Sequence, residues 1–277
     1  MMRPSEVLAR ATDYLERHGV EDARSSAELL LARVLGTDRA GLFARADGLS
    51  TAEASSFGRA LCQRCAGTPV QHLTGEQQFR HISLEMRPGV FVPRPETEIV
   101  VDAALRAIVG RAAPIVVDVG TGTGAIALSA KKERPDATVV ATEVSPEAVS
   151  LARDNARRLA LDVEVLEGDL LSPLPEGLAG ELDLIVSNPP YVTEEEYEDL
   201  PAEVKKDPQL ALLGGTSVHR TIAEAAAVWL RPGGSLVLEI GATQGAEVAA
   251  ILRESFTEVR VQRDLSGRDR IVSAVRP

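Results

Sequence analysis

A short apolar run in the second half of the chain ends in a sequence that can hold a planar amide. Residues 183–186 have the composition of a buried strand, and Asn188-Pro189-Pro190-Tyr191 follows almost directly. Two consecutive prolines lack backbone donors and fix φ, so the chain leaves the sheet in a stiff extended turn. The Asn188 side-chain carbonyl and the Pro189 main-chain carbonyl can each accept a hydrogen bond from an NH2 group, and Tyr191 offers a flat surface beside it. The alternative interpretation is a plain proline turn after a strand.

A glycine-rich turn lies upstream, between an expected strand and an expected helix. The strand covers residues 114–119, with Asp118 near its end, and runs into Gly120-Thr121-Gly122-Thr123-Gly124. Glycines allow positive φ and close approach of the backbone to a ligand, and a helix that begins near Thr123 aims free N–H groups at that ligand. Dinucleotide-binding folds use a related G-x-G-x-x-G pattern. The G-x-G-x-G spacing with a preceding acid resembles the methionine-pocket loop of class I methyltransferases.

Two further polar positions follow expected strands. Glu143 ends the strand expected over residues 137–142, where an acid can accept both hydroxyls of a ribose. This feature serves NAD as well as S-adenosylmethionine. Asp169 and Leu170 follow the strand expected over residues 163–167, where they can accept from an adenine amine and pack on the ring. A surface Gly-Asp turn explains that pair equally well. Ligands in open α/β sheets bind outside the carboxyl ends of the strands, so the four features together predict a nucleoside site that also includes Asn188.

Length and charge favour a two-domain cytoplasmic enzyme that has no membrane segment. The chain has 277 residues and a formal charge of −11. Residues 1–84 contain ten arginines and ten acidic residues, so the net negative charge falls on residues 85–277. An acidic catalytic domain repels duplex DNA and attracts a basic protein or a cationic cofactor, although an acidic surface also serves solubility. Cys62 and Cys65 are expected to be reduced thiols, and no metal site is expected.

The first part of the chain is expected to be a small helical domain. Apolar periodicity predicts helices over residues 5–18, 23–35 and 39–45, and Ser50 and Glu53 have the spacing of a capping box that opens a fourth helix through Cys65. Residues 77–86 alternate like a hairpin. We expect a helical domain over residues 1–75, a β-hairpin linker over 76–94 and a catalytic α/β domain over 95–277.

Several segments together resemble one family, the release factor glutamine methyltransferases (PrmC/HemK). They are Gln71-His72-Leu73-Thr74-Gly75, Phe91-Val92-Pro93-Arg94-Pro95-Glu96-Thr97-Glu98 and Gly267-Arg268-Asp269-Arg270. The resemblance implies a class I S-adenosylmethionine-dependent methyltransferase fold, an α/β doubly wound seven-stranded sheet, with a small N-terminal helical domain that docks substrate. It also implies that the segment from Phe91 to Glu98 lines the cofactor and substrate cleft, with Phe91 and Arg94 on the substrate side. The sequence departs from the family's pattern at one point, where the connection after Gly215 is shortened.

The reaction that the resemblance implies is N5-methylation of the glutamine in the Gly-Gly-Gln motif of bacterial peptide-chain release factors. The cofactor is then S-adenosyl-L-methionine, the product S-adenosyl-L-homocysteine, and the partner a release factor. We expect no direct nucleic-acid partner and a monomer.

The chemistry depends on positioning, because a carboxamide nitrogen is a poor nucleophile with a delocalised lone pair. Asn188, Pro189 and Tyr191 are the expected catalytic residues, and no general base is assigned. Pro190, Phe91 and Arg94 complete the expected substrate-binding set. Three alternatives remain open: a glutamine methyltransferase for another protein such as a ribosomal protein, an adenine-N6 DNA methyltransferase that acts on a flipped base, and a non-catalytic nucleoside-binding protein. The last would have no need for Asn188.

Overall fold

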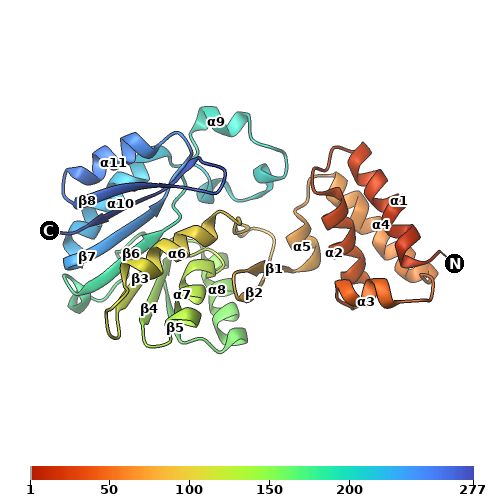
Figure 1. Cartoon of the computed structure of the whole chain (residues 1–277), viewed down its shortest axis with the longest axis horizontal. Coiled ribbons are helices and arrows are strands. Elements are labelled where there is room, and N and C mark those ends of the chain that lie inside the picture. Colours follow the sequence, from red (N-terminus) through yellow and green to blue (C-terminus); the bar gives the residue numbers. More distant parts are fainter. Residues whose placement is uncertain (1) are drawn as a thin grey trace. The chain divides into compact units, whose positions relative to one another are not determined.

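The computed structural model describes residues 2–277, which form two compact units (Figure 1). One unit contains the chain up to Glu76 together with Pro201–Lys206, and the other contains Gln77–Leu200 and Asp207–Pro277. The domain boundaries expected at residues 75 and 94 remain predictions, because a split by compactness does not test where a functional domain ends.

The first unit is helical. Its elements are α1 Pro4–Arg17, α2 Ala23–Leu35, α3 Arg39–Ala44, α4 Thr51–Cys65 and α5 Val70–Thr74. The expected capping box is present, because Ser50 Oγ accepts from Glu53 N at 3.3 Å and the Glu53 carboxylate accepts from Ser50 N at 2.7 Å. The short α5 was not predicted from the sequence; it fits between Pro69 and Gly75, whose φ of +78° ends the helix. Leucines from α1, α2 and α3 and Phe57 of α4 form the apolar core of this unit.

The second unit is built on a seven-stranded sheet. Its strands are β3 Ile115–Val119, β4 Thr138–Glu143, β5 Val163–Glu167, β6 Leu182–Ser187, β7 Leu230–Glu239, β8 Thr257–Arg263 and β9 Asp269–Val275. Their order is β5-β4-β3-β6-β7-β9-β8. The strands from β5 to β7 pair in parallel, whereas β9 is antiparallel to both β7 and β8. The expected seven-stranded doubly wound sheet is therefore confirmed. A separate two-stranded hairpin, β1 Glu76–Phe79 and β2 Ile82–Glu85, precedes the sheet.

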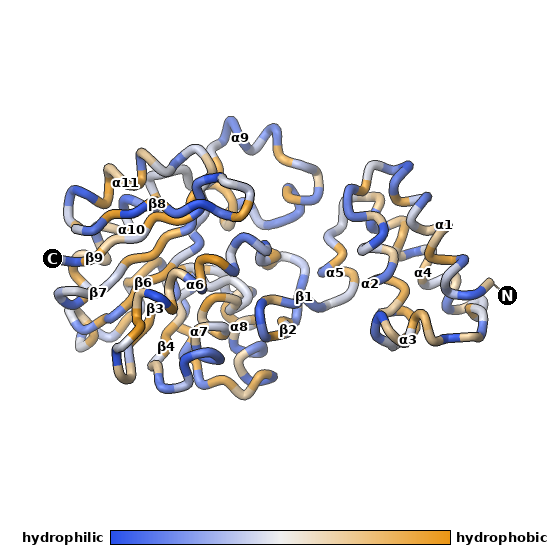
Figure 2. The backbone as a smooth tube through the Cα atoms, viewed as in Figure 1, coloured by the Kyte–Doolittle hydropathy of each residue, from blue (hydrophilic) through white to orange (hydrophobic). Residues whose placement is uncertain are grey.

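Helices cover both faces of the sheet, and successive strand residues point alternately toward the two faces. Val116 packs with α6 Thr97–Ala107, α7 Ala125–Glu133 and α8 Pro146–Leu159, whereas Val117 packs with α10 Gly215–Trp229 and α11 Gly245–Arg253. The central strands are correspondingly apolar along most of their length (Figure 2). Polar residues are therefore concentrated beyond the strand ends, where a site can form.

Two segments differ from expectation. β7 begins at Leu230 and so includes Pro232-Gly233-Gly234, which has the composition of a turn; the register with β6 is irregular here, since Leu230 pairs with Leu182 while Ser235 pairs with Leu184. The shortened connection after Gly215 is accommodated because α10 begins at Gly215 itself. The short helix α9 Glu194–Glu198 lies in the segment between Tyr191 and Gly214, and the sequence did not predict it.

Candidate functional site

The carboxyl ends of five parallel strands meet at one edge of the sheet. The register pairs Val119 of β3 with Thr142 of β4 and with Ser187 of β6, and it pairs Glu143 with Glu167 of β5. Ser187 in turn pairs with Leu238 of β7. The glycine turn, Glu143, Asp169 and Asn188 each lie at or just past one of these ends, so the fold places the predicted polar positions along a single edge.

The glycine turn is shaped by Asp118, which is fully buried at the end of β3. Its Oδ2 accepts from the Thr121 hydroxyl at 2.6 Å and from the Ala127 main-chain N–H at 3.0 Å. Oδ1 has no hydrogen-bond partner among residues 2–277. Burial raises the pKa of this carboxyl to about 7, while the two hydrogen bonds oppose that shift.

The glycines of this turn serve two different purposes. Gly120 and Gly122 have φ of +71° and +58°, and an added Cβ at either position would meet no protein atom within 4 Å. Gly124 has φ of +88°, and a Cβ there would lie 2.8 Å from a Leu128 methyl group. Gly124 therefore allows the turn to pack on α7, whereas Gly120 and Gly122 leave the backbone open to a ligand. Thr123 is buried, and its carbonyl accepts from Asn155 Nδ2 at 3.0 Å.

Glu143 is held in place by two main-chain donors. Its Oε2 accepts from Gly122 N and its Oε1 from Ser145 N, both at 2.9 Å. Each carboxylate oxygen retains a lone-pair direction for a further donor such as a ribose hydroxyl. Asp169 is exposed at the next strand end, and Leu170 beside it adopts φ of +47°, which is uncommon for a leucine. Leu170 also packs partly against the core beneath the sheet.

Asn188-Pro189-Pro190-Tyr191 leaves β6 with two acceptors unused. Neither Asn188 Oδ1 nor the Pro189 carbonyl accepts a hydrogen bond within the described chain. Asn188 Nδ2, by contrast, donates to Thr97 Oγ1 at 3.2 Å. The returning chain packs closely on this turn, because a Cβ at Gly214 would overlap the Pro190 carbonyl oxygen. The two free acceptors are the groups that the sequence assigned to an incoming NH2.

A buried carboxyl lies behind this turn at the end of β7. Glu239 Oε2 accepts from the Thr97 hydroxyl at 2.8 Å, and its Oε1 lies 3.5 Å from the Tyr191 hydroxyl. Burial raises the pKa of Glu239 to about 7, with the Thr97 hydrogen bond and the positive charge of Arg270 acting in the opposite direction. Burial also raises the pKa of Tyr191, and the negative charge of Glu239 adds to that effect. Tyr191 is therefore a neutral, partly buried phenol.

Phe91 and Arg94 precede α6 and contact one another. The Arg94 guanidinium lies 5.3 Å from the Phe91 ring centroid, and it pairs with buried Asp207 at 2.5 Å. Asp207 Oδ1 also accepts from Val92 N at 3.3 Å. Arg94 thus has a structural partner in addition to the substrate role expected for it.

Glu239 and His219 are site residues that the sequence reasoning missed, and Thr97 was included only as a member of the Phe91 to Glu98 segment. Buried His219 contacts the Glu239 carbonyl through Nε2 at 2.9 Å, and burial lowers the pKa of its ring. Thr97 and Glu239 are 142 residues apart, so no local spacing in the sequence connects them. Arg270, from the closing Gly267 to Arg270 motif, pairs with Asp264 at 3.2 Å and is close enough to Glu239 to affect its pKa.

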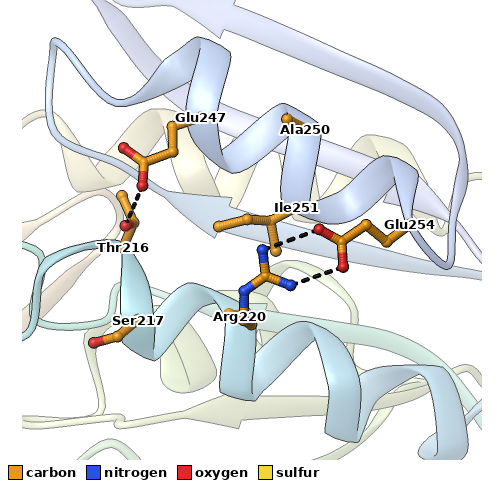
Figure 3. Close-up of a pocket in the computed structure, with 7 residues that line it drawn as sticks. All are labelled: Thr216, Ser217, Arg220, Glu247, Ala250, Ile251 and Glu254. Carbon is orange, nitrogen blue, oxygen red and sulfur yellow. Dashed lines mark hydrogen bonds and ion pairs between the residues drawn. The ribbon is translucent and has the colours of Figure 1, made fainter.

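A separate hollow lies between α10 and α11. Figure 3 shows Arg220 paired with both Glu254 oxygens, at 2.7 and 2.9 Å, and Thr216 donating to Glu247 at 2.6 Å. Each of these three charged groups thus already has a partner within the hollow. Among residues 2–277 no group of three or more His, Cys, Asp or Glu side chains is arranged to hold a metal ion. No helix in that range combines the length and apolar character needed to cross a membrane.

Comparison with known proteins identifies the family. The chain matches the PrmC N-terminal domain over residues 6–75 and the Methyltransferase small domain over residues 82–205. It is 41% identical over 279 residues to the release factor glutamine methyltransferase of Moorella thermoacetica, covering 98% of both chains. The corresponding protein of Deinococcus radiodurans is 42% identical over 280 residues and covers 99% of both chains. The chain belongs to the release factor glutamine methyltransferase family.

Solved structures agree with this family's fold. A methyltransferase from Pyrococcus furiosus has a TM-score of 0.53 at 22% identity, covering 69% of this chain and 87% of that one. A Thermus thermophilus 16S rRNA N2 G1207 methyltransferase, solved with AdoMet and guanosine, has a TM-score of 0.55 at 22% identity, covering 73% and 50% respectively. These likenesses show the fold alone. The chain is therefore a class I methyltransferase enzyme of the release factor glutamine methyltransferase family.

Proposed function

We propose that this enzyme transfers a methyl group from S-adenosyl-L-methionine to the side-chain nitrogen of the glutamine in the Gly-Gly-Gln motif of bacterial peptide-chain release factors. The observation that carries the proposal is the pair of unused acceptors, Asn188 Oδ1 and the Pro189 carbonyl, at the end of the strand next to the glycine turn. Two acceptors at one strand end match the two hydrogens of a carboxamide NH2. Relatives named release factor glutamine methyltransferase align over nearly the whole chain.

The residues around the glycine turn fit S-adenosylmethionine, which when bound supplies an electrophilic methyl group. Gly120 and Gly122 leave open space where a ligand can approach the backbone, and Asp118 Oδ1 is a buried acceptor without a partner in the described chain. We assign the methionine end of the cofactor to Asp118 and the residues from Gly120 to Gly124. Glu143 is assigned to the ribose, and Asp169 and Leu170 to the adenine, with Asn188 at the boundary with the substrate.

The proposed catalysis is positional. Asn188 Oδ1 and the Pro189 carbonyl accept the two NH2 hydrogens, which turns the nitrogen lone pair toward the methyl donor. Tyr191 packs on the amide plane, while Pro190, Phe91 and Arg94 shape the substrate side. The proton leaves after transfer, when the alkylated nitrogen has become strongly acidic, so no side-chain base is needed. The proposal further places the enzyme in the cytoplasm as a monomer, with residues 1–75 as the dock for the release factor.

Methyl transfer to an intact release factor tests the proposal. Incubation with the enzyme and S-adenosylmethionine should add 14 Da, the mass of one methylene, to the Gly-Gly-Gln peptide, as read by mass spectrometry. A release factor whose motif glutamine is changed to Ala is the matched control and should accept no methyl group. Undiminished labelling of that control indicates another protein residue, and labelling of adenine-rich duplex DNA indicates an adenine methyltransferase; either result overturns the proposal.

A further inference from the structure

The amide of Asn188 can face the substrate in two ways, and only one of them supports the proposed reaction. With Oδ1 outward the side chain accepts a hydrogen bond from the substrate NH2. With Nδ2 outward its own NH2 faces the substrate NH2, and neither group can accept from the other. Asn188 lies just past the end of β6, where rotation about its terminal torsion exchanges the two groups. A further contact must therefore fix its orientation.

Thr97 and Glu239 provide that contact. An ionised carboxylate is an acceptor only, so the Thr97 hydroxyl, 2.8 Å from Glu239 Oε2, must donate its single hydrogen to it. Thr97 Oγ1 then has only lone pairs to offer Asn188, 3.2 Å away, and can bind Nδ2 but not Oδ1. The direction of one hydrogen bond in the protein interior thereby sets the direction of the next.

We propose that Thr97 and Glu239 are positioning residues for methyl transfer: the Glu239 carboxylate orients the Thr97 hydroxyl, which holds the Asn188 NH2 and leaves Asn188 Oδ1 facing the substrate amide. The chain of contacts is buried at its inner end, since Thr97 and Glu239 are each 2% exposed. Buried polar groups in such a chain are costly to leave unpaired, so the arrangement is well defined. The expected effect of Thr97 and Glu239 on the rate of methyl transfer rests on the proposed function. The direction of the hydrogen bonds between Glu239, Thr97 and Asn188 does not.

The surroundings of Glu239 supply the counter-charge. Arg270 is the nearby cation and is itself held by Asp264 and by the Ile240 carbonyl. Glu96 adds a negative charge at the start of α6, and Tyr191 and His219 face Glu239 as neutral groups. The role of Arg270 in this arrangement accounts for the closing Gly267 to Arg270 motif. Protonation of Glu239 would allow it to donate to Thr97 and thus release the constraint on Asn188.

Nuclear magnetic resonance of the free enzyme tests the hydrogen bond without any substrate. The Asn188 NH2 protons should exchange with solvent about fivefold faster in Thr97→Val than in the wild type, the ratio expected for a hydrogen bond of ~1 kcal/mol. Thr97→Ser keeps the hydroxyl and should retain the slow exchange. Equal exchange in the wild type and Thr97→Val overturns the proposal, whether or not the enzyme acts on release factors.

Rates test the positioning role. Thr97→Val should lower kcat about 10- to 100-fold with little change in cofactor affinity, and Thr97→Ser should restore most of the loss. The pH profile is the second rate measurement: kcat of the wild type should rise with pH as Glu239 ionises, and Glu239→Gln should remove that rise. A wild-type enzyme that leaves release factors unmodified overturns the proposed function and leaves proton exchange to decide the positioning role.

The matched control is another threonine–glutamate hydrogen bond in the same unit. Thr216 donates to Glu247 at 2.6 Å beside the hollow between α10 and α11 (Figure 3), so Thr216→Val should leave kcat unchanged. In an Asn188→Ala background, Thr97→Val should have no further effect, because the group that it positions is gone. An equal loss of kcat from Thr97→Val in both backgrounds shows a general structural role and overturns the proposal.

Discussion

Two buried carboxyls mark the two halves of the site, and they differ in how far away along the chain their hydrogen-bond partners lie. Asp118 lies at the end of β3 and Glu239 at the end of β7, and burial raises the pKa of each to about 7. Each accepts from a threonine hydroxyl, Thr121 in one case and Thr97 in the other. The partners of Asp118 all lie within nine residues, whereas Thr97 and Glu239 are 142 residues apart.

This difference in sequence separation indicates different structural roles for the two carboxyls. A carboxyl with local partners shapes a single turn, and it can do so as soon as β3 and α7 have formed. A carboxyl with distant partners fixes segments relative to one another, so it depends on the completed sheet. We therefore expect changes near Asp118 to affect the cofactor and changes near Glu239 to affect the substrate amide. The predictions below test that separation.

The largest effect is expected at Asn188, the point where the Glu239 network meets the substrate. Asn188→Ala should lower methyl transfer by about 10²–10³-fold, because a positioned acceptor is lost from the transition state. Cofactor affinity, measured by calorimetry, should change little. A comparable loss of cofactor affinity would show that the two halves of the site do not act separately.

The second-largest effect is expected at Asp118, in the half of the site that we assign to the cofactor. Asp118→Ala leaves the buried Ala127 N–H and the Thr121 hydroxyl without their acceptor, which costs about 1–3 kcal/mol of unfolding free energy. The distorted turn should also weaken cofactor binding by about tenfold or more, read by calorimetry on the folded variant. Normal cofactor affinity in Asp118→Ala would contradict the assignment of this turn to the cofactor.

The pH dependence of stability should be similar for the two carboxyls. Each has a folded-state pKa above its unfolded value, so between about pH 4 and pH 7 the folded state holds more protons and the free energy of unfolding falls as pH rises. Asp118→Asn and Glu239→Gln should each flatten this fall by up to about 1.4 kcal/mol per pH unit. Denaturant titrations at several pH values provide the measurement, and an unchanged slope would mean that the replaced group titrates normally.

The smallest effect is expected for the threonine that serves Asp118. Thr121→Val removes one hydrogen bond of 2.6 Å and should cost about 0.5–1.5 kcal/mol in stability, with a similar weakening of cofactor binding. Thr97→Val is its counterpart in the other half, where the loss appears in kcat instead. Identical patterns for the two variants would remove the distinction between the halves.

The same contrast explains what the sequence could predict. Asp118, the glycines and Glu143 lie in short patterns where strand, turn and helix follow one another, so their placement follows from local rules. The capping box at Ser50 was predictable for the same reason. Thr97 and Glu239 meet only because α6 and β7 pack in the finished fold, and no spacing in the chain encodes that meeting. The early start of β7 at Leu230 was also missed, since Pro232-Gly233-Gly234 has the composition of a turn.

The segment that follows Tyr191 is a loop whose two ends are joined by backbone hydrogen bonds. Val192 N donates to the Leu212 carbonyl at 2.8 Å, and Gly214 N returns to the Val192 carbonyl at 3.0 Å. The residues between Val192 and Gly214 therefore form a loop whose two ends are hydrogen-bonded to each other. Insertions or deletions that spare the contact between Asp207 and Arg94 change the length of this loop and leave its two ends together, so they should not move Asn188.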